Sequence, residues 1–251
     1  MRASHSFPVF SVILLQLAGT VIFVQLVMLL VTAFIAGTTS VKTTPEDNSF
    51  EEDILTFEAT DRNSPPPEGA ILFVGDSTFT RWAIEEDLPG YKVINRGFGG
   101  SKMSDLLEFT DQIVLPYKPR LIVVQEGGND LHAGRTPEQL LADIKAFVEK
   151  VHQALPNVAI AIGSLNANPA RWSEADVRKS ANQIIKDYVS SQRNVSFVNF
   201  FEPFLGDDGK PQEELFVEDG GHPSALGYKL RAKIMRPILG EPDDQLARSS
   251  N

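Results

Sequence analysis

A serine and a histidine that lie far apart in the sequence provide the residue types of nucleophilic catalysis. Ser77 stands in Gly75-Asp76-Ser77, directly after an apolar run, where its hydroxyl can either face a binding site or cap the following helix. His222 stands in Asp219-Gly220-Gly221-His222-Pro223. An aspartate three residues before a histidine can accept a hydrogen bond from one ring nitrogen, which leaves the other nitrogen basic and directed outward. The alternative for this second motif is a surface turn with an incidental ion pair.

Two glycine-rich segments carry groups that can donate hydrogen bonds into a site. The segment Asn95-Arg96-Gly97-Phe98-Gly99-Gly100-Ser101 lacks the glycine spacing of a dinucleotide-binding loop. It is compatible with a phosphate cradle, a plain tight turn, or a backbone N–H donor for an oxyanion. The segment Glu126-Gly127-Gly128-Asn129-Asp130 contains an asparagine that is either a turn former or a side-chain donor to an oxyanion.

Short apolar runs precede these motifs and predict five buried strands. They are Ala70–Val74, Tyr91–Asn95, Leu121–Gln125, Val158–Ile162 and Val195–Phe200. Their nearly continuous hydrophobicity is typical of a parallel sheet covered on both faces. Ligands of such sheets bind beyond the carboxyl ends of the strands, and the candidate chemical residues follow the apolar runs.

Helical patterns separate the predicted strands. The clearest begins with the capping box Thr136-Pro137-Glu138-Gln139, and a second is predicted from Ser173 through Tyr188. A last helix follows Ser224. Its apolar face is expected to consist of Leu226, Leu230 and Ile234. Alternating strands and helices predict an α/β domain in which helices cover both faces of a parallel sheet.

The four motifs, taken in order, resemble the blocks of the SGNH (GDSL-type) hydrolases, which are named for their Ser, Gly, Asn and His residues. The resemblance covers the chain from about Phe50 to Leu239. It implies a flavodoxin-like, three-layer fold with a five-stranded parallel sheet, and a serine esterase or acylhydrolase activity. Thr78 departs from the pattern, because many members have Leu or Ile after the serine, which puts the local pocket in doubt but not the nucleophile.

The resemblance also implies a catalytic triad. Ser77 would be the nucleophile, His222 the general base and Asp219 the residue that orients the imidazole. Asp76 and Asp130 would be structural and would hold the loops. The mechanism would use neither a cofactor nor a metal ion.

An oxyanion hole is implied in the same way. The backbone N–H groups of Ser77 and Gly100 and the side chain of Asn129 would be its donors. Gly99 is the alternative to Gly100 if the turn is offset by one residue.

Two other functions compete with an esterase. A metal-dependent phosphoesterase would need more ligands, because the chain has no Asp-x-His pair and His222 has no histidine nearby in sequence. The second alternative is a membrane-tethered module that binds a glycan or a lipid on an inactive hydrolase fold.

The expected substrate is a small ester, with a lipid or an acylated glycan as open options. We interpret Arg171-Trp172 as a cap of the following helix rather than as pocket lining.

The beginning of the chain predicts a membrane anchor. No charged residue occurs between Phe7 and Gly37, a run of 31 residues. A spanning helix needs about 20 apolar residues, and the apolar part of a cleaved signal usually has about 7–15. We therefore predict a single-pass anchor over residues 1–37 with the catalytic domain outside the cytoplasm. Secretion after cleavage is the alternative.

Composition and charge divide the rest of the chain. Residues 38–69 form an acidic, proline-containing linker, residues 70–240 the hydrolase domain, and residues 241–251 a polar tail. Within the linker, Phe50, Ile54 and Phe57 have the spacing of a short amphipathic helix that docks on the domain. The net charge of −10 argues against nucleic acid as a partner, and the lack of cysteine excludes disulfides and thiolate chemistry.

Overall fold

A computed structural model of the chain describes residues 50–243. The predicted anchor (residues 1–37), the first part of the predicted linker and the tail beyond residue 243 lie outside this range. Between residues 50 and 243, none of the helices combines the length and the apolar character that a bilayer crossing requires.

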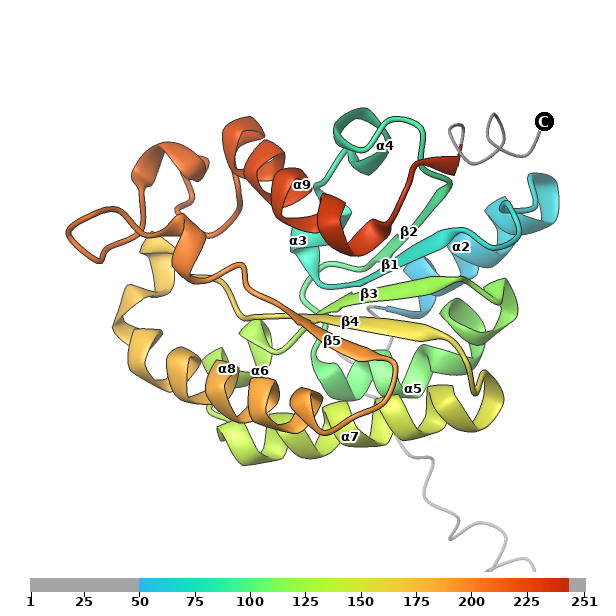
Figure 1. The fold of residues 1–251 in the computed structure, drawn as a ribbon, viewed down its shortest axis with the longest axis horizontal. Coiled ribbons are helices and arrows are strands. Elements are labelled where there is room, and N and C mark those ends of the chain that lie inside the picture. The colour runs from blue at the N-terminus through green and yellow to red at the C-terminus, as the bar shows by residue number, and fades with distance from the viewer. Residues whose placement is uncertain (1–49, 244–251) are drawn as a thin grey trace, which may run out of the picture. The chain divides into compact units, whose positions relative to one another are not determined.

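A five-stranded parallel sheet, in the order β2-β1-β3-β4-β5, forms the middle layer (Figure 1). The strands are β1 Ile71–Gly75, β2 Val93–Gly97, β3 Leu121–Gln125, β4 Ala159–Gly163 and β5 Val195–Val198. Every residue of β1 and β3 is buried, because helices cover both faces of the sheet. The five predicted strands are confirmed.

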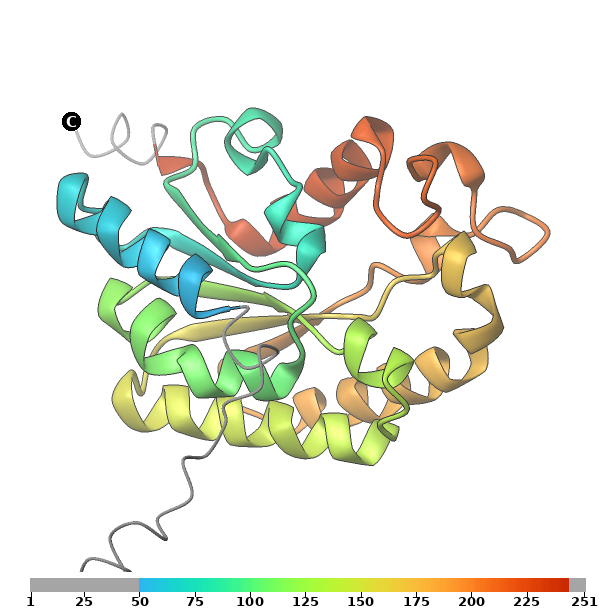
Figure 2. The same cartoon turned by 180° about the vertical axis from the view of Figure 1, so that it is seen from behind.

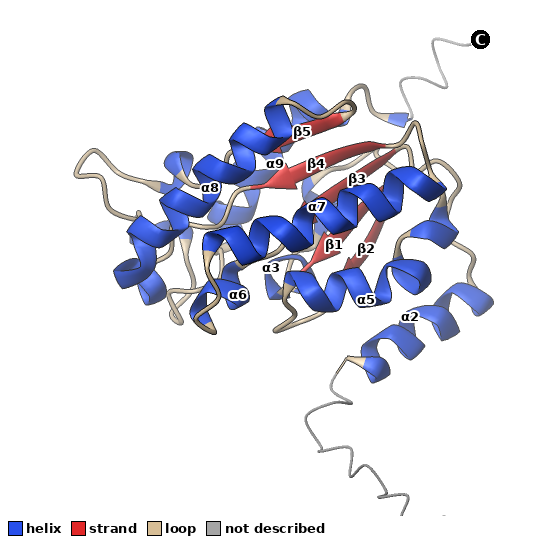
Figure 3. Ribbon diagram, turned by 90° about the horizontal axis from the view of Figure 1, so that it is seen from below, coloured by secondary structure: helices blue, strands red, loops and turns tan. Residues whose placement is uncertain are grey.

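Helices form the two outer layers (Figures 1 and 3). One layer contains α2 Glu51–Asn63, α5 Met103–Ile113, α7 Pro137–Ala154 and α8 Ala175–Ser190, and the other contains α3 Ser77–Thr80, α4 Ile84–Asp87 and α9 Ala225–Leu239. The short helix α6 Gly128–His132 follows β3 at the carboxyl edge of the sheet. Four 3-10 helices complete the described elements: Leu115–Tyr117, Pro169–Glu174, Glu202–Phe204 and Glu213–Leu215. The result is the three-layer α/β sandwich that the alternating pattern predicts.

Helix α7 begins at its predicted capping box. The Thr136 hydroxyl accepts from the Gln139 backbone N–H at 3.3 Å, and the Gln139 side chain accepts from the Thr136 backbone N–H at 2.9 Å. Two N–H groups that have no partner within the helix are thereby satisfied. The prediction for α8 needs a small correction, because a 3-10 turn occupies Pro169–Glu174 and the α-helix begins at Ala175 rather than at Ser173.

The predicted apolar face of α9 is wrong in part. Leu226 is 54% exposed, while Leu230 and Ile234 are only partly buried. The buried face consists of Gly227, Tyr228, Arg231, Ala232, Met235 and Leu239. A fully buried arginine in the middle of this face interrupts its apolar period, so the pattern favoured the neighbouring stripe.

Helix α2 is the docking helix predicted within the linker (Figure 2). Its Ile54 is only 3% exposed and packs in the core between the sheet and the helices α5, α7 and α8. Asp61, at the other end of the helix, forms an ion pair with Arg96 and accepts a hydrogen bond from the Tyr117 hydroxyl. The guanidinium of Arg96 also lies over the ring of Phe57, 4.9 Å from its centre. Apolar burial and charge pairing therefore both hold α2 against the domain.

If α2 is a structural part of the domain, Ile54→Ala should lower the free energy of unfolding by about 2–5 kcal/mol, because it leaves a cavity in the core. Leu55→Ala, on the exposed side of the same helix, is the matched control and should change it by less than about 0.5 kcal/mol. Urea denaturation measures both values. Equal effects of the two substitutions would contradict the docking.

Candidate active site

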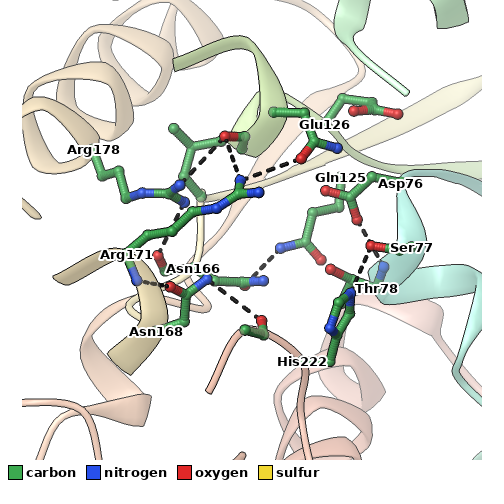
Figure 4. Close-up of a pocket in the computed structure, with 14 residues that line it drawn as sticks. Asp76, Ser77, Thr78, Gln125, Glu126, Asn166, Asn168, Arg171, Arg178 and His222 are labelled. Atoms are coloured by element: carbon green, nitrogen blue, oxygen red, sulfur yellow. Dashed lines mark hydrogen bonds between the residues drawn. The ribbon is translucent and has the colours of Figure 1, made fainter. Parts of the chain in front are cut away.

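A continuous chain of hydrogen bonds joins Ser77, His222 and Asp219, and Figure 4 shows its bond between Ser77 and His222. The Ser77 Oγ lies 2.8 Å from His222 Nε2, and His222 Nδ1 lies 2.7 Å from Asp219 Oδ2. Ser77 is the first residue of α3, directly after β1, whereas His222 lies in the loop before α9. The fold therefore brings the Ser77 hydroxyl to a histidine 145 residues away in the sequence, whose carboxylate partner is three residues from it. This is the arrangement of a serine hydrolase triad.

Two local features position Ser77. The Asp76 carboxylate accepts from the Thr78 backbone N–H at 2.8 Å and so caps α3. At Gly75 a side chain is excluded, because a Cβ would lie 2.1 Å from the carbonyl oxygen of Gln125. The absence of a side chain at Gly75 therefore lets β1 lie close to β3 up to its last residue, and the serine follows at the carboxyl edge of the sheet.

Backbone groups hold the Asp219 carboxylate beside the imidazole. Its Oδ1 accepts from the N–H groups of Gly221 and His222 at 2.8 and 2.9 Å, and its Oδ2 also accepts from Arg81 Nη1 at 2.9 Å. Desolvation opposes ionisation, but these backbone bonds and the imidazole outweigh it and hold the pKa of Asp219 below its usual value. An anionic carboxylate at Nδ1 favours the tautomer that carries its proton on Nδ1, which leaves His222 Nε2 able to accept a hydrogen bond from the Ser77 hydroxyl.

The predicted oxyanion donors lie near Ser77 to different degrees. Asn129, in α6, lines the same cavity as Ser77, and its Nδ2 donates to the Ser101 carbonyl at 2.9 Å. A Cβ at Gly99 would lie 3.8 Å from the Cβ of Ser77, so this loop runs beside the serine. Gly100, with φ of +87°, follows in the same loop but does not line the cavity.

The cavity in front of the serine is small and polar, with a volume of about 90 Å³. Ser77 and His222 lie on one side of it, and Arg171, Arg178 and Asn166 lie on the other (Figure 4). Leu165 is the one apolar side chain among the described residues that line it. The lining of the cavity therefore offers a ligand hydrogen bonds rather than apolar contacts.

Residues 68–230 match the GDSL-like lipase/acylhydrolase family, and this range contains all four motifs. The chain belongs to this family. Platelet-activating factor acetylhydrolase IB subunit alpha1 of Bos taurus is 24% identical to the chain over 187 residues, which are 70% of this chain and 78% of that protein. Membership indicates an ester hydrolase.

Two solved structures show the same fold. A GDSL-like lipase from Bacteroides thetaiotaomicron is 18% identical, covers 74% of this chain and 96% of its own, and has a TM-score of 0.64. A carbohydrate esterase family 3 protein from Talaromyces cellulolyticus is 19% identical, covers 72% of this chain and 98% of its own, and has a TM-score of 0.53. At these identities the likeness concerns the fold of the GDSL domain.

The interpretation of Arg171 as a helix cap is wrong. Its Nη1 donates to the Gly128 carbonyl at 3.0 Å and to Asn129 Oδ1 at 3.2 Å, and the side chain lines the cavity of the GDSL domain. Trp172 instead stacks on Phe201, outside the cavity. Arg171 follows β4, so the strand-end rule that identified the other candidate residues would also have indicated it.

Glu126 is a buried acid that lines the cavity, and sequence reasoning treated it only as part of a glycine-rich turn. Desolvation, and secondarily the nearby Asp76, raise the pKa of its carboxyl well above the usual value. The Ser101 hydroxyl and the Gly127 backbone N–H are its hydrogen-bond partners.

Between residues 50 and 243, no three histidine, aspartate or glutamate side chains are grouped as ligands of a metal ion.

The raised pKa of Glu126 predicts a pH-dependent stability. A carboxyl with a raised folded pKa keeps a proton that the unfolded chain loses above about pH 4.3, so it makes stability fall as pH rises beyond that value. Glu126→Gln removes this titration. We expect the difference in free energy of unfolding, variant minus wild type, to become more positive as the pH rises from about 4 to about 8. Urea denaturation at a series of pH values measures this difference. The exposed Glu108→Gln is the control, and a difference that does not grow with pH would contradict the prediction.

Proposed function

We propose that the GDSL domain hydrolyses carboxylic esters through an acyl-enzyme at Ser77. The observation that carries the proposal is the hydrogen-bond chain from Asp219 through His222 to the serine hydroxyl at the cavity. His222 Nε2 takes the serine proton while Oγ attacks the carbonyl carbon, and the same proton then passes to the departing alcohol oxygen. A water molecule then attacks the acyl carbon while His222 takes its proton, and His222 passes that proton to Oγ as the bond from Oγ to the acyl carbon breaks, which releases the carboxylic acid and restores the serine.

The negative charge of the tetrahedral intermediate needs donors, and three are proposed. The Ser77 backbone N–H is in the first turn of α3, where it has no acceptor within the helix. One N–H of Asn129 Nδ2 is occupied by the Ser101 carbonyl, and the other is available on the cavity side. The backbone N–H of Gly100, or of Gly99 in an offset turn, would be the third.

The size of the cavity favours a short acyl group. A volume of about 90 Å³ is well below the roughly 300–1,000 Å³ of typical small-molecule pockets. This space suits an acetyl group and not an extended acyl chain. The name of the Bos taurus relative, an acetylhydrolase, agrees with this proposal.

The acyl-enzyme mechanism predicts the effect of removing the serine hydroxyl. Ser77→Ala should lower the turnover of 4-nitrophenyl acetate by at least about 10³-fold and abolish labelling by a fluorophosphonate probe, because no nucleophile remains. The matched control is Ser173→Ala, which alters an exposed serine and should leave both properties unchanged. Wild-type turnover by Ser77→Ala would show that the chemistry takes place elsewhere.

The small cavity predicts a preference among esters of one alcohol. We expect kcat/KM for 4-nitrophenyl acetate to exceed that for 4-nitrophenyl octanoate by at least about tenfold, because the longer chain loses transition-state contacts in the cavity. Steady-state kinetics with both esters, below the concentration at which the octanoate forms micelles, measure the ratio. A preference for the octanoate would mean that the acyl chain binds outside this cavity.

A further inference from the structure

Two asparagine side chains line the cavity, and an arginine holds the carbonyl oxygen of each. Arg171 Nη1 donates to Asn129 Oδ1 at 3.2 Å. Arg231 Nη2 donates to Asn166 Oδ1, which also accepts from Gln125 Nε2 at 2.7 Å. Asn129 already has a proposed role in the mechanism, whereas Asn166 has none.

Arg231 determines which way the Asn166 carboxamide points. The arginine side chain is completely buried, lies over the ring of Phe200 at 4.3 Å, and forms no ion pair with any residue between 50 and 243. Burial lowers the pKa of Arg231 to about 10, so the guanidinium is still a cation at neutral pH. A buried cation without a carboxylate partner requires oxygen acceptors, and here the side-chain oxygens of Gln125 and Asn166 supply them. Rotating the Asn166 amide by 180° would place its NH₂ group against this cation.

The oxygen of Asn166 is therefore fully used, and its nitrogen is not. Two donors occupy the two lone pairs of Oδ1, whereas Nδ2 has no acceptor among the described residues. Asn166 is partly exposed and lines the cavity on the side opposite Ser77 and His222 (Figure 4). With the acetyl group of an ester beside Ser77, the ring of its alcohol part would extend across the cavity toward the side on which Asn166 is partly exposed.

We propose that Asn166 is a substrate-binding residue that selects esters whose alcohol part carries hydrogen-bond-accepting oxygens. An acylated polyol or sugar ring has such oxygens next to the ester, whereas a hydrocarbon alcohol has none. A hydrocarbon alcohol would cover the NH₂ donors of Asn166 without pairing them, which costs binding free energy. This inference rests on the proposed esterase function and adds the class of alcohol.

Asn166→Asp tests the inference with little change of shape. The new carboxylate gives Arg231 a charged partner, so the thermal midpoint should not fall, but both N–H donors are lost. The two substrates are a monoacetylated methyl xyloside and cyclohexyl acetate, which are both acetates of six-membered rings. We expect the ratio of kcat/KM for the sugar ester to that for cyclohexyl acetate to fall by about tenfold, the effect of about one lost hydrogen bond. A general effect of the added charge on catalysis cancels in this ratio.

Two further variants keep the test decisive. Asn166→Ser leaves a hydroxyl acceptor for Arg231, removes the amide donors, and should lower the same ratio if the aspartate variant does not fold. Asn199→Asp is the matched control, because it adds the same charge outside the cavity and keeps an oxygen for the N–H groups of Phe201 and Glu202. Its ratio should equal that of the wild type.

The outcomes separate the inference from the proposed function. Hydrolysis of cyclohexyl acetate that disappears in Ser77→Ala supports the esterase function whatever Asn166 does. If that hydrolysis is present and the substrate ratio is unchanged in the folded Asn166 variants, the inference is overturned and the esterase function stands. If no ester is hydrolysed through Ser77, both are overturned.

Discussion

The site depends on one hydrogen-bond chain, which runs from a carboxylate through an imidazole to a serine hydroxyl. Its two ends come from opposite ends of the domain, since Ser77 follows β1 and the pair Asp219 and His222 precedes α9. A parallel sheet makes this meeting possible, because the carboxyl ends of all its strands lie on one edge. The close contact of Gly75 with β3, the Asp76 cap and the backbone bonds to the Asp219 carboxylate then hold the groups at hydrogen-bond distance.

Around this chain, arginine side chains set the direction of neutral amide groups. Arg171 and Arg231 donate to the oxygens of Asn129 and Asn166, so the second N–H of Asn129 and both N–H groups of Asn166 have no acceptor among the described residues. An amide has no strong preference of its own between its two orientations, but a nearby cation provides one. Conversely, Glu126 lies in a site where burial raises the pKa of its carboxyl. The polarity of the cavity is therefore a consequence of its lining, which includes Arg171 and Glu126, and of Arg231, which is outside the lining.

Features encoded within a short stretch of sequence were predicted well. The strands are continuous apolar runs, and the α7 capping box lies within four residues, so neither depends on distant contacts. Features that depend on a partner elsewhere in the chain were missed. The buried face of α9 contains Arg231, whose acceptors belong to β3 and to the loop after β4, and Arg171 was interpreted as a local cap although it contacts α6.

The sequence by itself determined the α/β class, the order of the strands and helices along the chain, the membership of the GDSL family and the candidates for the triad, because these follow from local patterns and ordered motifs. It also predicts the membrane anchor at residues 1–37, which lies outside the described range and stays a prediction. Only the tertiary structure decided which way the carboxamides point, how small the cavity is and which charges are buried. Those properties arise from atoms that are distant in sequence and adjacent in space, and no periodicity or motif records such contacts.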